Sequence, residues 1–233
     1  MPDLIINGHK HHYEQVGTGG APLVFLASTR YDSAASWVAY MEKNASGFRM
    51  IIPDIRGMAG SEHTTDVKGE DWVSDLAALL DELKLDSVHI SAETLGTRVA
   101  TRFAVEYPGR TKSLILNGPI AYSYAEGDSE RATQPQERID SMKQYHGEDA
   151  AAINAFYLKL HADPAFHEYF DLRKIGADVQ APAFDARYVA LADTCFFEAT
   201  GAMESPGGWA SGDDHLRRVF RRRNHVVRIL YLV

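Results

Sequence analysis

Hydrophobic and polar positions follow two different periods along the first half of the chain. Short runs rich in apolar residues occupy residues 23–26, 49–54 and 113–117, a pattern typical of strands that are buried on both faces of a parallel sheet. Residues 71–84 instead carry apolar side chains at helical spacing, which predicts an amphipathic helix. Strands and helices therefore alternate over residues 23–117, and this order predicts an α/β protein with a mostly parallel sheet covered by helices.

The ends of the chain carry strand-like patterns of their own. Residues 3–6 and 11–16 flank the pair Asn7-Gly8. Because Asn-Gly accepts the positive φ angles of a tight turn, we expect an antiparallel hairpin at the N-terminus. Residues 226–233 form another strand-like run, which we expect to return to the sheet as its last strand.

The strand pattern fades between about residue 120 and residue 220. This stretch is polar at first, then helical in pattern over residues 139–160, and it is rich in aromatic residues. It predicts an inserted helical cap, whose aromatic side chains either line an apolar pocket or pack between the cap helices. We therefore divide the chain into a core of residues 1–119, a cap of residues 120–220 and a last strand within residues 221–233.

The composition limits the classes of protein that fit this pattern. The 233 residues are 45% hydrophobic and 24% charged, which excludes a disordered chain and allows a substantial core. The net charge of −8 argues against a nucleic-acid binder, because phosphate binding needs an excess of Lys and Arg. The arginines within residues 217–223 form one basic patch, which we expect to face water.

The cysteine and histidine content bears on compartment and metal binding. Cys195 is the single cysteine, so the chain has neither an internal disulfide nor a Cys-based zinc site, which fits a reducing compartment. No segment approaches the roughly 18 apolar residues of a membrane span. We therefore expect a cytoplasmic protein with no membrane contact. His9, His11 and His12 lack the further ligands of a metal set, so we expect no metal and interpret them as a solvated hairpin face.

Two loops that follow predicted strands carry motifs. Residues 54–61 read Asp-Ile-Arg-Gly-Met-Ala-Gly-Ser, and residues 88–96 read Val-His-Ile-Ser-Ala-Glu-Thr-Leu-Gly. With the order of elements over residues 4–119, they resemble the α/β-hydrolase superfamily. The first is similar to its D-x-R-G-x-G-x-S loop, with Ala59 in place of a Gly, and the second is similar to its strand, nucleophile elbow and helix. The resemblance implies an α/β-hydrolase-like sheet, a small-molecule substrate and chemistry that needs no cofactor.

The resemblance places Thr94 at the nucleophile position, where the family usually has Ser. A nucleophile on a sharp strand-to-helix turn needs small residues two positions away on either side, and Ala92 and Gly96 meet this need. The extra methyl of Thr crowds an approaching carbonyl and restricts χ1, so we expect reduced or altered reactivity. Alternatively, Thr94 closes a structural turn in a non-catalytic relative. Glu93, its neighbour, is interpreted as a carboxylate at the pocket rim.

The resemblance also implies two backbone donors for an oxyanion, the N–H groups of Thr29 and Leu95, which do not depend on side-chain identity. Residues 27–29 read Ala-Ser-Thr where the family usually has His-Gly and then a donor residue. Ser28 excludes backbone conformations that Gly allows, so the geometry of this donor is expected to differ.

The acid and the base of the family's catalytic triad stay unknown. In the family both follow the nucleophile, on loops after later strands. Because residues 226–233 resemble the strand before the acid loop, the resemblance puts both loops beyond Val233. Four late residues could substitute, although each is interpreted as an ordinary polar residue. They are Asp213, Asp214, His215 and His225.

These observations predict a hydrolase of a small, partly apolar carboxylic ester or lactone that acts through Thr94. The alternative is a catalytically silent or truncated hydrolase-like protein that binds a small apolar ligand or pairs with another subunit. Missing strands would leave a sheet edge exposed, which favours a homodimer. Cofactor-free chemistry other than hydrolysis is a third reading, since the fold does not fix the reaction.

Overall fold

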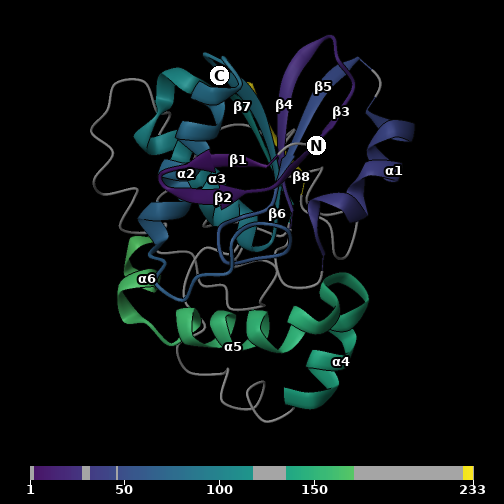
Figure 1. Ribbon diagram of the computed structural model, residues 1–233. Coiled ribbons are helices and arrows are strands. Elements are labelled where there is room, and N and C mark those ends of the chain that lie inside the picture. Colours follow the sequence, from purple (N-terminus) through teal and green to yellow (C-terminus); the bar gives the residue numbers. More distant parts are fainter. Residues whose placement is uncertain (1–2, 28–31, 46, 118–134, 171–227, 233) are drawn as a thin grey trace, which may run out of the picture.

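The structure is a computed structural model that describes residues 3–27, 32–45, 47–117, 135–170 and 228–232. Within these residues, one sheet has six strands in the order β3-β5-β4-β6-β7-β8, and a separate small sheet pairs β1 with β2 (Figure 1). The small sheet is formed by β1 (Leu4–Ile6) and β2 (His9–His11). The large sheet is formed by β3 (Tyr13–Val16), β4 (Ala21–Leu26), β5 (Phe48–Pro53), β6 (Val88–Glu93), β7 (Thr111–Asn117) and β8 (Arg228–Leu232).

The centre of the large sheet is parallel, as predicted. β4 lies between β5 and β6, with Val24 opposite both Ile51 and Ile90, and all three side chains are fully buried. β6 also runs parallel to β7, whereas β3 pairs antiparallel with β5. Apolar strands buried on both faces favour this arrangement, so the predicted α/β fold class is confirmed.

Helices cover both faces of the sheet (Figure 1). They are α1 (Ala34–Asn44), α2 (Gly69–Glu82) and α3 (Leu95–Glu106), with the short η1 (Pro108–Arg110) after α3. Leu23 and Phe25 of β4 pack with Met41 of α1 in one buried cluster, whereas Val24 and Leu26 pack with residues of α2 and α3 in the other. Because successive residues of a strand point to opposite faces, β4 serves both cores.

The N-terminal hairpin turns at Asn7 and Gly8, whose φ angles are 51° and 81°. Two successive positive φ angles fit the Asn-Gly turn that the sequence predicts. The predicted second strand over residues 11–16 is wrong in one respect, because the structure divides it between two sheets. His12 separates β2 from β3: its carbonyl accepts from the Asp54 N–H and its N–H donates to Ser61 Oγ, so the 54–61 loop replaces the hairpin partner there.

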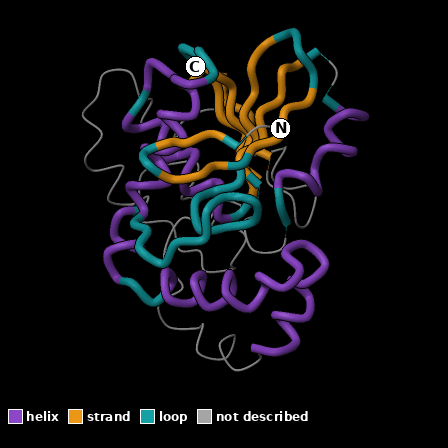
Figure 2. Tube along the Cα trace, in the orientation of Figure 1, coloured by secondary structure: helices purple, strands orange, loops and turns teal. Residues whose placement is uncertain are grey.

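A group of helices lies apart from the sheet, as Figure 2 shows. These are α4 (Pro135–His146), η3 (Gly147–Asp149), α5 (Ala150–His161) and α6 (Pro164–Tyr169). α4 and α5 overlap the helical pattern predicted over residues 139–160, whereas α6 lies beyond it. Both predicted boundaries of the cap lie outside the described residues. In the part of the chain that the structure describes, no helix combines the length and the apolar character that crossing a bilayer requires.

Two glycines provide the contact between these helices and the rest of the molecule. A Cβ atom at Gly57 would lie 2.6 Å from the ring of Phe156 on α5. A Cβ atom at Gly69, the first residue of α2, would lie 2.7 Å from the ring of Phe170. Trp72 of α2 packs edge-on against Phe166 of α6 with 5.4 Å between ring centroids. At Gly57 and Gly69 the aromatic rings can approach this closely because the facing residue has no side chain.

Within the run predicted as the last strand, β8 joins the sheet next to β7, and the sequence predicted neither this neighbour nor the direction of the strand. β8 runs antiparallel to β7, with Arg228 opposite Asn117 and Leu232 opposite Ser113. Since Asn117 also pairs with Glu93, the start of β8, and not its end, faces the turn that bears Thr94. An apolar run does not encode its direction, because antiparallel edge strands are common on mostly parallel sheets.

Candidate active site

Thr94 occupies a sharp turn between β6 and α3. Its backbone angles are φ 40° and ψ −111°, so a β-branched residue lies in the left-handed half of the backbone map. Such a conformation costs about 1–3 kcal/mol and persists only where the surrounding structure imposes it. Here β6 is paired on both sides and α3 is buried, so the chain has to reverse within this one residue. The Thr94 side chain is exposed at the top of the turn.

The residues two positions from Thr94 are small because β4 passes directly beside them. Ala92 is fully buried and lies opposite Leu26 in the register of β4 and β6. A Cβ atom at Gly96 would lie 2.4 Å from the Leu26 carbonyl oxygen, which is shorter than any tolerated contact. These contacts give the physical reason for the two small residues that the sequence shows at these positions.

The start of α3 adds backbone donors to this turn. Leu95 is its first residue, and the first N–H groups of a helix have no acceptor within the helix. Thr97 donates both its backbone N–H, at 3.1 Å, and its hydroxyl to the Thr94 carbonyl. This pair of bonds fixes the Thr94 peptide and leaves the Leu95 N–H at the positive end of the helix.

The other predicted oxyanion donor, Thr29, lies outside the described residues. A small cavity of about 10 Å³ lies nearby, at the carboxyl ends of β4 and β5. Its lining includes Ala27, Asp32 and Ser33 on either side of the Thr29 segment, and Asp54 from the loop after β5. The predicted donor segment therefore starts and ends at the edge of the sheet that bears Thr94.

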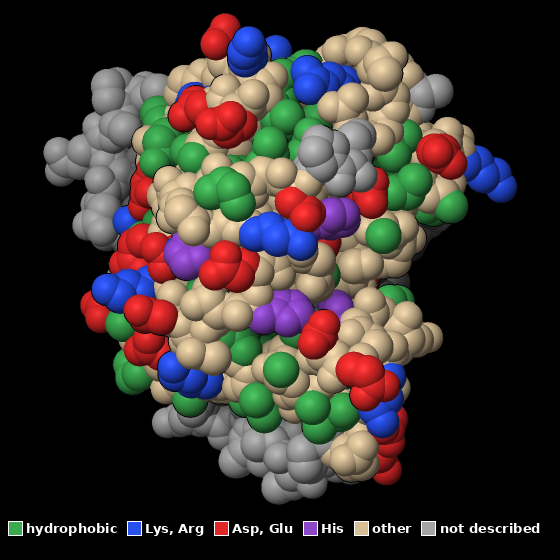
Figure 3. All heavy atoms as spheres, in the orientation of Figure 1, with side chains coloured by type: hydrophobic (Ala, Val, Ile, Leu, Met, Phe, Trp, Pro, Cys, Tyr) green, Lys and Arg blue, Asp and Glu red, His purple; other side chains and the backbone are tan. Residues whose placement is uncertain are grey.

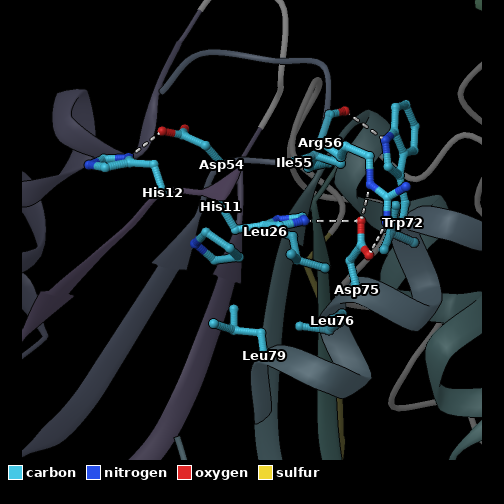
Figure 4. A pocket seen from close by; sticks show the side chains of 12 residues that line it. His11, His12, Leu26, Asp54, Ile55, Arg56, Trp72, Asp75, Leu76 and Leu79 are labelled. Atoms are coloured by element: carbon cyan, nitrogen blue, oxygen red, sulfur yellow. Dashed lines mark hydrogen bonds and ion pairs between the residues drawn. The ribbon is translucent and has the colours of Figure 1, made fainter. Parts of the chain in front are cut away.

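Asp54 connects three segments at this edge. Its Oδ1 accepts from the Ala34 N–H at 2.7 Å, and its Oδ2 accepts from the Gly60 N–H at 3.2 Å. The Oδ2 atom also bonds His12 Nδ1 at 2.6 Å (Figure 4). The hydrogen bond that the Asp54 carboxylate accepts raises the pKa of the His12 imidazole, while burial of the ring opposes this. The sequence analysis missed this pair, although Asp54 is the first residue of the motif.

A second buried network lies beside it, around a cavity of about 30 Å³. Arg56 donates to both carboxylate oxygens of Asp75 on α2, and the distance from its Nε to Asp75 Oδ2 is 2.8 Å. Asn7 of the hairpin turn donates to Asp75 Oδ1 at 2.8 Å. His11 Nε2 lies 3.4 Å from Asp75 Oδ2 (Figure 4), a distance too long for a strong bond. Burial and the nearby Arg56 lower the His11 pKa despite Asp75, so we regard this imidazole as neutral.

The predicted solvated face of the three histidines is therefore wrong for His11, which is only 6% exposed. His9 and His11 lie on the same face of β2. His11 is covered by α2, where it lies beside Asp75, whereas His9 pairs with Glu62 at 3.1 Å nearer the surface. Histidine side chains lie among acidic ones in the middle of this face of the molecule (Figure 3). Within the described residues, no group of three or more His, Cys, Asp or Glu side chains is arranged to hold a metal ion.

The acid and the base of a triad are not identified by these contacts. Glu93 is partly buried beside Thr94. The four late candidates, Asp213, Asp214, His215 and His225, lie outside the described residues. The described part of the site thus consists of the Thr94 turn, the donors at the start of α3 and the Asp54 contacts.

Comparison with known proteins adds a family match. A family model described as alpha/beta hydrolase fold matches residues 22–154. Among curated proteins, the 2-hydroxy-6-oxo-2,4-heptadienoate hydrolase of Pseudomonas putida is 28% identical over 124 residues, which cover 52% of this chain and 45% of that protein. The 2-hydroxy-6-oxo-6-phenylhexa-2,4-dienoate hydrolase of Comamonas testosteroni is 28% identical over 143 residues, covering 59% and 48%. The matched region thus spans less than half the length of these relatives.

Solved structures share the same arrangement of elements. A meta-cleavage product hydrolase from Pseudomonas fluorescens IP01 matches with a TM-score of 0.53 and 18% identity, covering 81% of this chain and 71% of that one. A structure from a study of carboxylesterases of Nitrososphaera gargenis matches with a TM-score of 0.62 and 18% identity, covering 76% of each chain. At these identities the likeness is one of fold.

Proposed function

Because this chain belongs to the alpha/beta hydrolase fold family, we propose that it hydrolyses a small, partly apolar carbonyl compound, with Thr94 as the nucleophile. The observation that carries the proposal is the backbone of Thr94, which holds φ 40° at the turn from β6 into α3. A nucleophile elbow requires this conformation because it lifts the hydroxyl clear of the sheet. A turn with only a structural role would be free to use Gly or Asn at positive φ.

In the proposed reaction, Thr94 Oγ1 attacks the carbonyl carbon while its proton passes to a base that we do not assign. The carbonyl oxygen becomes an oxyanion, which the N–H groups of Leu95 and Thr29 stabilise together with the positive end of α3. Collapse expels the leaving group and leaves an acyl group on Thr94. Water then attacks the acyl carbon and regenerates the hydroxyl, so no cofactor takes part.

We propose a carboxylic ester or lactone as the substrate, and a second class as the main competitor. The names of the curated relatives specify hydrolases of 2-hydroxy-6-oxo-dienoic acids, which also present a carbonyl carbon to a nucleophile. Helices α4, α5 and α6 support a cap over residues 120–220, whose apolar side chains would contact either substrate.

The test is hydrolysis of short-chain p-nitrophenyl esters, a lactone and a 2-hydroxy-6-oxo-dienoate by the wild type, Thr94→Ala and Thr94→Ser. We expect Thr94→Ala to lose turnover by about 10³-fold or more, since covalent catalysis needs the hydroxyl. Thr94→Ser should retain or raise it, because it removes the methyl that crowds the carbonyl. Thr65→Ala is the matched control, an exposed threonine in a loop away from the turn.

The same panel discriminates the alternatives. Turnover that survives in Thr94→Ala would contradict the nucleophile and point to other cofactor-free chemistry on the fold. A folded wild type and a folded Thr94→Ser that both lack turnover would favour the silent, ligand-binding protein. The homodimer and the cytoplasmic location stay predictions. Size-exclusion chromatography with light scattering tests the first, and a stable monomer would contradict it.

A further inference from the structure

The imidazole of His12 is held in one position by the sheet edge around it. Its ring lies over Gly60, where a Cβ atom would come within 2.8 Å of His12 Cγ. The His12 backbone is fixed at both polar atoms, because its N–H donates to Ser61 Oγ and its carbonyl accepts from the Asp54 N–H, each at 3.0 Å. The Nδ1 atom therefore points at the Asp54 carboxylate without the entropy cost of ordering a free side chain.

The charges around His12 are mainly acidic. Asp54 Oδ2 lies 2.6 Å from Nδ1, and Glu14 Oε1 lies 3.4 Å from Nε2. Asp3, at the start of the hairpin, adds a weaker attraction, while burial of the ring opposes its protonation. The neighbouring His11 faces Asp75 and Arg56 on the other side of the hairpin, and its pKa is lowered. The net effect raises the His12 pKa, so His12 carries a positive charge at neutral pH more readily than a free histidine.

The Asp54 carboxylate lies close enough to the Thr94 turn for its charge to be felt there. Asp54 follows β5 and Thr94 follows β6, with β4 between them. Neighbouring strands are about 4.8 Å apart, which puts Asp54 roughly 10 Å from the turn at Thr94. Asp54 also accepts from the N–H of Ala34, the first residue of α1. An unneutralised Asp54 would therefore both disfavour a new negative charge at Thr94 and hold α1 less firmly.

We propose that His12 is a positioning residue for the Thr94 site, which it serves through Asp54. In its charged form His12 neutralises the Asp54 carboxylate and holds it against the N–H groups of Ala34 and Gly60. In its neutral form it can keep one hydrogen bond to Asp54, but it leaves the negative charge uncompensated near the oxyanion position. The proposal rests on the proposed function for its catalytic consequence, and on the geometry alone for its effect on stability.

The first test measures the pair without any activity. The wild-type His12 imidazole is titrated by NMR, and we expect its pKa above the ordinary 6.5, with the resonance assigned by its loss in His12→Asn. Because the folded-state pKa is raised, the stabilisation is present below pH 6.5 and is lost as the pH rises through the folded-state value. At pH 6 we expect the melting temperature of His12→Asn to lie roughly 2–4 °C below that of the wild type. This difference in melting temperature should shrink at higher pH.

Asparagine is the informative replacement because its Nδ2 takes the place of Nδ1 and keeps the hydrogen bond to Asp54 without a titrating charge. His9→Gln is the matched control, since it removes another hairpin histidine that pairs with a carboxylate, Glu62, and does not contact Asp54. We expect the His12 imidazole to keep its raised pKa in His9→Gln. A His12 pKa at or below 6.5, or a melting gap independent of pH, would overturn the proposal.

The second test follows turnover of the ester or dienoate substrate against pH. We expect the ratio of wild-type to His12→Asn kcat to be about fivefold at pH 6, falling toward one along a single titration with the NMR-measured pKa. A purely structural role would change KM or the amount of folded enzyme and give a ratio that is flat with pH. Absence of turnover in the wild type would contradict the proposed function, while the NMR and melting measurements would still decide the His12–Asp54 pair.

Discussion

Ala59 has a strained backbone conformation in the loop at the sheet edge that bears Thr94. It lies at φ 47° in the 54–61 loop, a conformation that L-residues with a Cβ atom adopt at a cost of about 1–2 kcal/mol. The motif that this loop resembles has Gly there. The structure shows that the chain retains the glycine conformation with an alanine.

We predict that Ala59→Gly stabilises the protein by about 0.5–1 kcal/mol, because relief of the strain exceeds the entropy that Gly adds to the unfolded chain. Chemical denaturation measures the change. Ala162→Gly is the control, since Ala162 is exposed at the end of α5 with an ordinary φ of −88°. There the same substitution should destabilise. Equal effects at the two positions would contradict the strain at Ala59.

His11 and His12 are adjacent residues whose pKa values shift in opposite directions. Burial lowers the pKa of His11, so its contribution to stability is present above pH 6.5 and is lost as the pH falls toward its folded-state value. We predict that the free energy of unfolding of His11→Leu falls less between pH 7 and pH 5 than that of the wild type. Denaturation at several pH values tests this, with the exposed His63 replaced by Gln as the control. A loss as steep as in the wild type would show that His11 is not responsible.

The chemistry of these residues was only partly predictable from the sequence. The positions of Thr94, Ala92 and Gly96 follow from a strand, a turn and a helix that are local in the chain. The partner of His12 does not, because Asp54 is separated from it by 42 positions in the sequence. The hairpin pattern could not show that α2 covers His11, because Asp75 lies 64 positions further along the chain.

At the scale of elements, the close packing of α6 on α2 depends on Gly69, which has no side chain. Phe170 is buried between Trp72 and Phe166, with ring centroids 6.3 Å and 5.0 Å away, so its ring cannot move aside easily. We predict that Gly69→Ala destabilises the protein by about 1–3 kcal/mol, as in other overpacked cores. Thermal unfolding measures the loss.

The control for this prediction is Gly109→Ala in η1, where a Cβ atom would meet no atom within 4 Å. That substitution should be close to neutral. The double variant Gly69→Ala with Phe170→Leu should recover part of the stability, because the smaller side chain makes room for the new methyl group. A Gly69→Ala protein as stable as Gly109→Ala would refute the close packing of α6 on α2.

Strand pairing is the element-scale property that the sequence predicted least well. The apolar runs located β4, β5 and β7 because such strands are buried on both faces, whereas the motif over residues 88–96 located β6. The division of β2 from β3 was missed because it arises from the contacts of His12 with the 54–61 loop. The direction of β8 was not predicted, because an apolar run does not encode strand direction.

For the whole molecule, the contacts at Gly57 and Gly69 connect the helices α4 to α6 with the sheet and its covering helices. Trp72 lies within this contact and is fully buried. We predict that the described parts unfold in one transition. Trp fluorescence and far-UV circular dichroism should then give the same midpoint in urea. A fluorescence change that precedes the loss of helix and sheet would show that the helices detach first.

The fit of His12 over Gly60 has a consequence for how this loop can vary between related chains. The motif allows any residue at position 60. Here, however, any Cβ atom at this position would collide with the imidazole ring of His12. The two positions should therefore covary. Relatives with a side chain at the position of Gly60 should have a residue smaller than histidine at the position of His12, whereas relatives that retain histidine should also retain glycine. An alignment in which the two vary independently would show that the loop has another way to accommodate the ring.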